Sequence, residues 1–200
     1  MRETSSIMRR AALLLGLAAL WVCPALAADT VPVRLDAARA AHAKGDLARA
    51  AIELEAAVAE LQSRLGKMLG DFLPPPPTGW QAEPVEIQSL SGSGGGLAVT
   101  RAYARDDNTL NVSLIIDSPA VAAAAAQLAN SAQPNTRKVK VGGEDAVLRW
   151  DSQGRNGEVL LVPGPRILLQ IEGDNLGSAD VLSEAAKGWN LAGIKKALPQ

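Results

Sequence analysis

The chain has 200 residues, of which 48% are hydrophobic and 20% charged, with 20 basic and 21 acidic side chains, one histidine and one cysteine. This length is sufficient for one domain with a hydrophobic core and a small appendage. The balanced charge argues against the basic surface of a nucleic-acid-binding protein, and one cysteine cannot form a disulfide framework or a thiolate metal site.

The N-terminal segment 1–27 has the layout of a secretory signal peptide. Two arginines precede an apolar run over 11–22, and a small-x-small motif follows at 25–27. We expect cleavage after Ala27, and the high alanine content suggests a GC-rich bacterium, which makes the periplasm the expected location. Retention as an N-terminal anchor and lipidation at Cys23 are the alternatives.

Removal of this leader changes the charge and the cysteine count. The leader contains three arginines and one glutamate, so its loss would leave 17 basic and 20 acidic residues, a net charge of −3, and no cysteine. A mildly acidic surface argues against a nucleic-acid partner. No later apolar run approaches the length needed to cross a bilayer, so no membrane span is expected in the mature chain.

Residues 28–73 are predicted to form a helical hairpin, with helices over 33–44 and from Leu47 onward, joined at Gly45-Asp46. Apolar residues of the second helix recur in alternating steps of four and three, which is typical of a heptad seam. The seam positions are Leu47, Ala51, Leu54, Val58, Leu61, Leu65, Met68 and Phe72. The first helix is only about half as long as the second, so we expect it to cover the first half of the seam. The following domain or a second chain would cover the rest.

The segment around Gly45-Asp46 also resembles the turn of a tetratricopeptide repeat, in which small residues let two helices pack closely. A single such unit cannot bury the continuous core of a repeat array, which needs about three units. An isolated hairpin is therefore the favoured interpretation, with a repeat groove as the alternative.

A proline-rich hinge is predicted over 74–79, and an α+β domain over 80–200. Four consecutive prolines favour a stiff polyproline II segment. Because this spacer is short, we expect the hinge to fold the long helix back on the sheet, with Trp80 near the contact.

The domain after the hinge shows alternating apolar patterns separated by turn residues. Strands are expected at 80–88, 97–105, 109–117, 137–141, 144–150, 158–162 and 166–172, and helices at 118–130 and 179–187. Strands joined by short turns pair antiparallel. The predicted fold is therefore α+β, with an antiparallel sheet of about six to seven strands and helices packed on one face.

No residue is predicted to be catalytic, to bind a cofactor or to ligate a metal. His42 has no second imidazole or thiol near it in the sequence, and 92–96 is glycine-rich but lacks the Lys-Ser/Thr of a phosphate-binding loop. The acidic turns at 106–108 and 151–158 do not match a calcium-binding loop. Asp, Asn and Gly are common in β-turns, so turn formation explains the composition of both segments.

Three features together resemble a family of secreted proteobacterial proteins with no assigned activity: the Gly-Asp hairpin turn, the junction Leu73-Pro-Pro-Pro-Pro-Thr-Gly-Trp80, and the segment Asp117-Ser-Pro119. The Leu-Pro-x-x-Pro-x-Gly-Trp pattern is the most specific part. By element order alone, the sheet region more loosely resembles Mog1/PsbP-like α+β domains. That resemblance implies a binding or assembly module rather than an enzyme.

The expected function is that of a periplasmic, non-enzymatic binding or assembly-accessory protein. Its partner would be another periplasmic protein, a second copy of the chain, or a small apolar ligand. The expected contact residues are Leu61, Leu65, Met68, Phe72 and Trp80. One alternative is a cofactor-free hydrolase that uses a carboxylate pair in a cleft beside the glycine loop. Another is a metal-delivery or calcium-binding protein.

Overall fold

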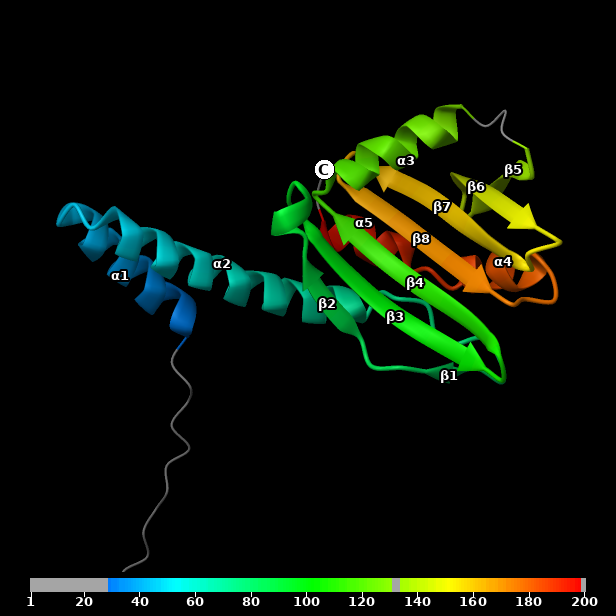
Figure 1. Ribbon diagram of the computed structural model, residues 1–200, viewed down its shortest axis with the longest axis horizontal. Helices are drawn as coiled ribbons and strands as arrows, with labels where there is room; N and C mark the ends of the chain where they lie inside the picture. The colour runs from blue at the N-terminus through cyan, green and yellow to red at the C-terminus, as the bar shows by residue number, and fades with distance from the viewer. Residues whose placement is uncertain (1–28, 131–133, 199–200) are drawn as a thin grey trace, which may run out of the picture.

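The computed structural model describes residues 29–130 and 134–198, and the predicted signal peptide lies outside these ranges (Figure 1). The helices are α1 (Thr30–Ala43), α2 (Leu47–Gly70), α3 (Pro119–Ala129), α4 (Asp180–Lys187) and α5 (Leu191–Ala197), with a 3₁₀ turn η1 at Ser91–Ser93. The strands are β1 (Gln81–Ala82), β2 (Glu86–Ser89), β3 (Leu97–Arg105), β4 (Asn108–Ile116), β5 (Thr136–Val141), β6 (Glu144–Asp151), β7 (Asn156–Gly164) and β8 (Ile167–Asp174).

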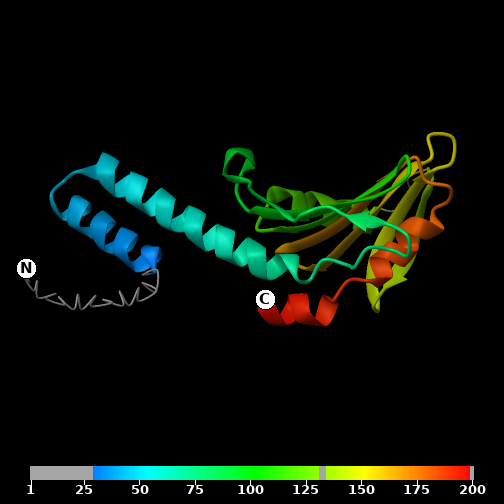
Figure 2. The same ribbon diagram turned by 90° about the horizontal axis from the view of Figure 1, so that it is seen from below.

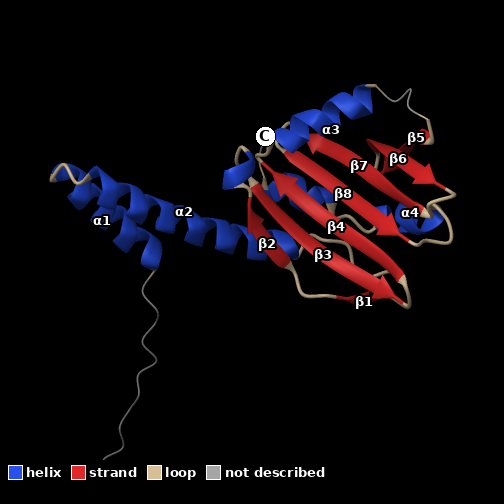
Figure 3. Ribbon diagram, in the orientation of Figure 1, coloured by secondary structure: helices blue, strands red, loops and turns tan. Residues whose placement is uncertain are grey.

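One antiparallel sheet contains all of these strands, in the order β1-β3-β4-β8-β7-β6-β5, and β2 also pairs with β3 (Figure 3). The predicted α+β class is confirmed. The sheet has eight strands rather than six or seven, because the single strand expected at 80–88 is two short strands. Pro84 separates them, and both pair with the same edge of β3. Proline cannot donate a ladder hydrogen bond, so it interrupts this edge.

The β3–β4 hairpin is the most regular part of the sheet. Nine residue pairs join the two strands, from Leu97–Ile116 to Arg105–Asn108. Asp106 takes a left-handed conformation at the turn (φ 53°), which short polar residues tolerate. Every second residue of β4 from Leu110 to Ile116 is buried, as the alternation predicts.

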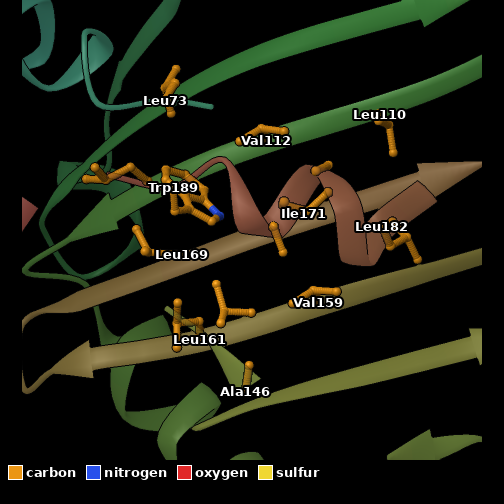
Figure 4. Close-up of a cluster of buried hydrophobic side chains, with 14 of the residues drawn as sticks. Leu73, Leu110, Val112, Ala146, Val159, Leu161, Leu169, Ile171, Leu182 and Trp189 are labelled. Atoms are coloured by element: carbon orange, nitrogen blue, oxygen red, sulfur yellow. The ribbon is translucent and has the colours of Figure 1, made fainter. Parts of the chain in front are cut away.

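The main hydrophobic core lies between one face of the sheet and α4 and α5 (Figures 2 and 4). Leu182 of α4, Ile194 of α5 and Trp189 in the connection between these helices are buried in this layer. Trp189 and Leu182 lie over the strand residues Val112 and Ile171 (Figure 4). The C-terminal helices therefore close one face of the sheet.

The opposite face of the sheet is partly covered by α3, so the helices do not lie on one face as expected. Val121 and Ala124 of α3 pack on Leu160 and Leu168, which point away from the main core. Ile115 joins this smaller cluster. The outward apolar residues form a patch that needs cover, and a helix made mostly of alanine can approach it closely.

Candidate functional site

Helix α2 is the longest helix and extends away from the sheet together with α1 (Figure 1). Asp46 caps its start by accepting a hydrogen bond from the backbone N–H of Arg49 at 3.0 Å. Gly45 precedes this cap with φ 77°, a conformation that only glycine adopts without strain, so the turn reverses the chain sharply. The predicted helical hairpin is present, with its two helices over Thr30–Ala43 and Leu47–Gly70.

The two helices of the hairpin pack through small side chains. Ala38 and Ala41 of α1, and Ala50 and Ala57 of α2, are all buried. Among them lies Glu53, which is 6% exposed. Alanine contacts let two helices approach closely, and they make a narrow interface because little apolar side chain is available to bury.

Two arginines neutralise the buried Glu53 carboxylate. Arg34 of α1 lies 3.1 Å from it and Arg49, one turn earlier on α2, lies 2.6 Å from it. Both guanidinium groups are substantially exposed, so they stay hydrated while they pair with the carboxylate. This cluster fixes the rotation of α2 relative to α1.

The fixed rotation leaves the heptad seam exposed, which corrects the expectation that α1 covers its first half. Five large residues of the seam are between 43% and 65% exposed: Leu47, Leu54, Val58, Leu61 and Met68. We call these five residues the apolar stripe. The stripe lies roughly a quarter of a turn around α2 from the alanine face. Close alanine packing and the Glu53 ion pairs therefore determine which face α1 occupies.

The C-terminal end of α2 packs on its own sheet domain. Leu69 is fully buried in the main core, and Leu65 packs against the same core from the side. Two glycines, Gly66 and Gly70, let α2 approach β2 and the residues that precede β2. A Cβ at Gly66 would overlap the Cγ2 methyl of Ile87, and one at Gly70 would lie 3.3 Å from Val85. Only the last turns of α2 make the predicted contact with the sheet region, and these glycines allow it. The rest of the helix extends away from the sheet, so the expectation that the hinge folds the whole helix back on the sheet was wrong (Figures 1 and 2).

The proline-rich segment holds this contact in place. The Tyr103 hydroxyl donates a hydrogen bond to the carbonyl of Pro74, and Trp80 is 7% exposed with the Arg105 guanidinium 5.0 Å from its ring centroid. Phe72 lies next to Gly193 of α5. Arg105 itself is exposed, and a cation–π contact with an exposed guanidinium is favourable by about 0.5–1 kcal/mol.

The five predicted contact residues therefore separate into two groups. Leu65, Phe72 and Trp80 contact the chain's own domain, whereas Leu61 and Met68 face solvent. The stripe residues that the prediction did not single out are Leu47, Leu54 and Val58. The recurrence of these three residues at seam positions was the sequence signal that could have identified them.

A polar groove of about 410 Å³ lies on the sheet face that α3 leaves open. Strand register brings Glu158 of β7 directly opposite Glu172 of β8, with Asn111 and Arg149 beside them on the neighbouring strands. Directly opposite residues have Cβ atoms about 5 Å apart. The two carboxylates therefore share one site, at the end of the sheet opposite the glycine loop.

The two glutamates of the groove have different surroundings. Arg149 pairs with Glu158 at 2.5 Å, whereas Glu172 accepts a hydrogen bond from the Gln170 amide at 2.9 Å. Partial burial raises the pKa of Glu172, and the nearby carboxylates of Glu158 and Asp174 raise it further. Two carboxyl groups in unlike environments are an arrangement that acid–base catalysis uses.

A second groove, of about 510 Å³, runs between the proline-rich segment and α4. Trp80 and Val181 give it apolar lining, and Arg105, Asp180 and Glu184 give it charge. Three prolines and Ala185 also line it, so its surface is mainly apolar with a few charged groups, which is the character of small-ligand sites in general.

Within residues 29–130 and 134–198, no helix is long and apolar enough to cross a membrane, and no three metal-ligating side chains of His, Cys, Asp or Glu gather in one place. His42 is exposed on α1. Comparison with known protein families, with curated proteins and with solved structures finds no match. Function must therefore be argued from this chain's own residues.

Proposed function

We propose that this chain is a periplasmic, non-enzymatic binding or assembly-accessory protein that contacts a partner protein through the apolar stripe of α2. The observation that carries this proposal is the exposure of the stripe on a helix whose end is fixed to the sheet domain. The periplasmic location rests on the signal-peptide layout of 1–27.

The length and regular spacing of the stripe support a binding role. At roughly half exposure, five such side chains present on the order of 450 Å² of apolar surface, which is comparable with the largest patch on a typical monomeric protein. The stripe spans Leu47 to Met68, about 32 Å along the helix axis. Anchors at successive helical turns are the pattern by which a helix docks into an apolar groove or against another helix.

The position of the stripe also supports this role. The hairpin extends beyond the sheet domain, so a partner can reach the stripe from the side (Figures 1 and 2). Docking of Leu69 and the glycine contacts hold the base of α2. A surface presented on a rigid element loses little conformational entropy on binding.

Capture experiments test the proposal with matched variants. Immobilised Leu54→Lys/Leu61→Lys protein is compared with wild type and with Ala59→Lys, which places one such charge on an exposed residue about 100° around the helix from Val58. We expect wild type and Ala59→Lys to retain the same protein from periplasmic extract and the double variant to lose it. Equal retention by all three would contradict the proposal.

A second candidate function is favoured by the carboxylate pair in the polar groove. In this alternative the chain is a cofactor-free hydrolase, with Glu172 as the acid and Glu158 as the base that activates water. Turnover of chromogenic ester, peptide and glycoside substrates tests it. Glu158→Gln and Glu172→Gln should each abolish turnover, and Asp151→Asn at the edge of the groove should retain it. No turnover by the wild type would refute this alternative.

A further inference from the structure

We infer that the partner of the apolar stripe is a second copy of this chain, with the two α2 helices antiparallel and centred between Val58 and Leu61. The two hairpins would then form a four-helix assembly with a sheet domain at each end. This inference rests on the proposed function, because it names the occupant of the same surface.

The spacing of the seam lets two antiparallel copies of α2 pack with their seam residues in register. When two copies of α2 run antiparallel about a two-fold axis between Val58 and Leu61, Val58 lies opposite Leu61 of the other copy, and Leu54 lies opposite Leu65. Ala51 then lies opposite Met68, which combines a small residue with a large one. Layers of this kind are the knobs-into-holes contacts of antiparallel helices.

The net charge of the two halves of α2 favours the antiparallel orientation, and Glu55 and Lys67 contribute most to it because Glu53, Glu60, Arg49 and Arg64 already form ion pairs within the chain. Residues 47–60 carry three glutamates and one arginine, whereas residues 61–70 carry one arginine, one lysine and no acid. An antiparallel pair places the acidic half of each helix beside the basic half of the other. A parallel pair would place like charges together, and like-charge pairs oppose association. The helix dipoles also favour the antiparallel orientation.

The stripe area accounts for most of the area that a specific pair needs. Each copy contributes on the order of 450 Å² of apolar surface, so two copies bury about 900 Å² before flanking side chains are added, close to the 1,000 Å² that a specific interface needs. The hairpin gains as well, since its own interface contains mainly alanines. An assembly of four helices around the stripe residues gives each hairpin the hydrophobic core that its own two helices lack.

Sedimentation equilibrium of the mature chain 28–200 tests the inference. We expect wild type at 100 µM to have twice the monomer mass. Val58→Glu/Leu61→Glu should weaken association at least about 100-fold, because it buries carboxylates without partners. Ala59→Glu should leave association unchanged. Circular dichroism verifies the fold, and Val58→Ser/Leu61→Ser is the milder pair if the first variant does not fold. A monomeric wild type, or a dimer that the stripe variants leave intact, would overturn the inference.

Spin-label distances test the orientation in the mature chain 28–200, which contains no native cysteine. Ala48 and Ala59 are both exposed on the side of α2 away from the stripe. In the inferred pair, the two labels at Ala59 are level along the helix axis, whereas those at Ala48 are displaced by about 35 Å. A parallel pair makes both sets level and overturns the inference. If wild type is monomeric, the capture experiment still decides the proposed function independently.

Discussion

The contact between α2 and β2 depends on Gly66, and substitution of this glycine by alanine should give an effect of unusual sign. In an ordinary exposed helix position, Gly→Ala stabilises a protein by about 1 kcal/mol. At Gly66 the added Cβ overlaps the Cγ2 methyl of Ile87 and lies 3.0 Å from its Cγ1 and Cδ1. The Cγ2 methyl is attached directly to the Cβ of Ile87, so relief of the overlap requires the strand or the helix to move.

The magnitude follows from two opposing effects. Overpacking of this kind costs about 1–3 kcal/mol, and the gain in helix propensity offsets about 1 kcal/mol of it. We therefore expect Gly66→Ala to lower the free energy of unfolding by about 1 kcal/mol. In an Ile87→Ala background the overlap is absent, so the same change should raise the free energy of unfolding by about 1 kcal/mol.

Urea denaturation followed by circular dichroism measures all four proteins of this cycle. Gly70→Ala is the matched control, because its Cβ would lie 3.3 Å from Val85, a distance that small adjustments accommodate. A stabilising Gly66→Ala in the wild-type background would refute the docking of α2 on β2. So would a cycle with no coupling between Gly66 and Ile87.

Three further predictions concern single side chains. Glu53→Gln removes the charge that two arginines share inside the hairpin, so it should destabilise the hairpin by about 1–2 kcal/mol. The value is small because both arginines are exposed to solvent. Hydrogen exchange over α1 should become faster, and unchanged exchange would contradict the ion-pair assignment. Tyr103→Phe removes the hydrogen bond to Pro74 and should cost about 1 kcal/mol in urea denaturation; an unchanged midpoint would show that this bond contributes nothing. The raised pKa of Glu172 means that the folded chain holds this proton to a higher pH than the unfolded chain, so stability should fall as pH rises from the ordinary glutamate pKa through the raised one. Glu172→Gln should flatten this fall in thermal melts, and a pH dependence identical to that of wild type would be inconsistent with the shift.

The β3–β4 hairpin could be predicted because the sequence signals that specify it lie within the hairpin itself. Alternation from Leu110 to Ile116 identifies the buried face, and polar residues at 106–108 identify the turn. The observed strands, Leu97–Arg105 and Asn108–Ile116, differ from the predicted ones by at most one residue at each end.

The environment of the heptad seam could not be predicted in the same way. Spacing shows that Leu54, Val58 and Leu61 share one face of α2, but it does not show which neighbour covers that face. Ala50 and Ala57 compete for the same neighbour, and close backbone approach together with the Glu53 ion pairs favours them. Such competition is decided by packing rather than by periodicity.

The polar groove was inaccessible to sequence reasoning for a different reason. Glu158 and Glu172 are fourteen positions apart, and they become neighbours only through the register of β7 and β8. That register includes an irregularity between Leu161 and Gly164, so counting back from the turn does not give the pairs. A shift of one residue would place these carboxylates on opposite faces.

Site-specific photo-crosslinking in intact bacterial cells tests the role of the apolar stripe most directly. A benzophenone amino acid is introduced one position at a time at Leu54, Val58 and Leu61, and at the exposed residues Ile52 and Ala59 as controls. Protein adducts should form at the three stripe positions and not at the two controls, with the spacing of three to four residues that one helix face imposes. Absence of adducts at the stripe, or equal yields at all five positions, would contradict a binding function for α2.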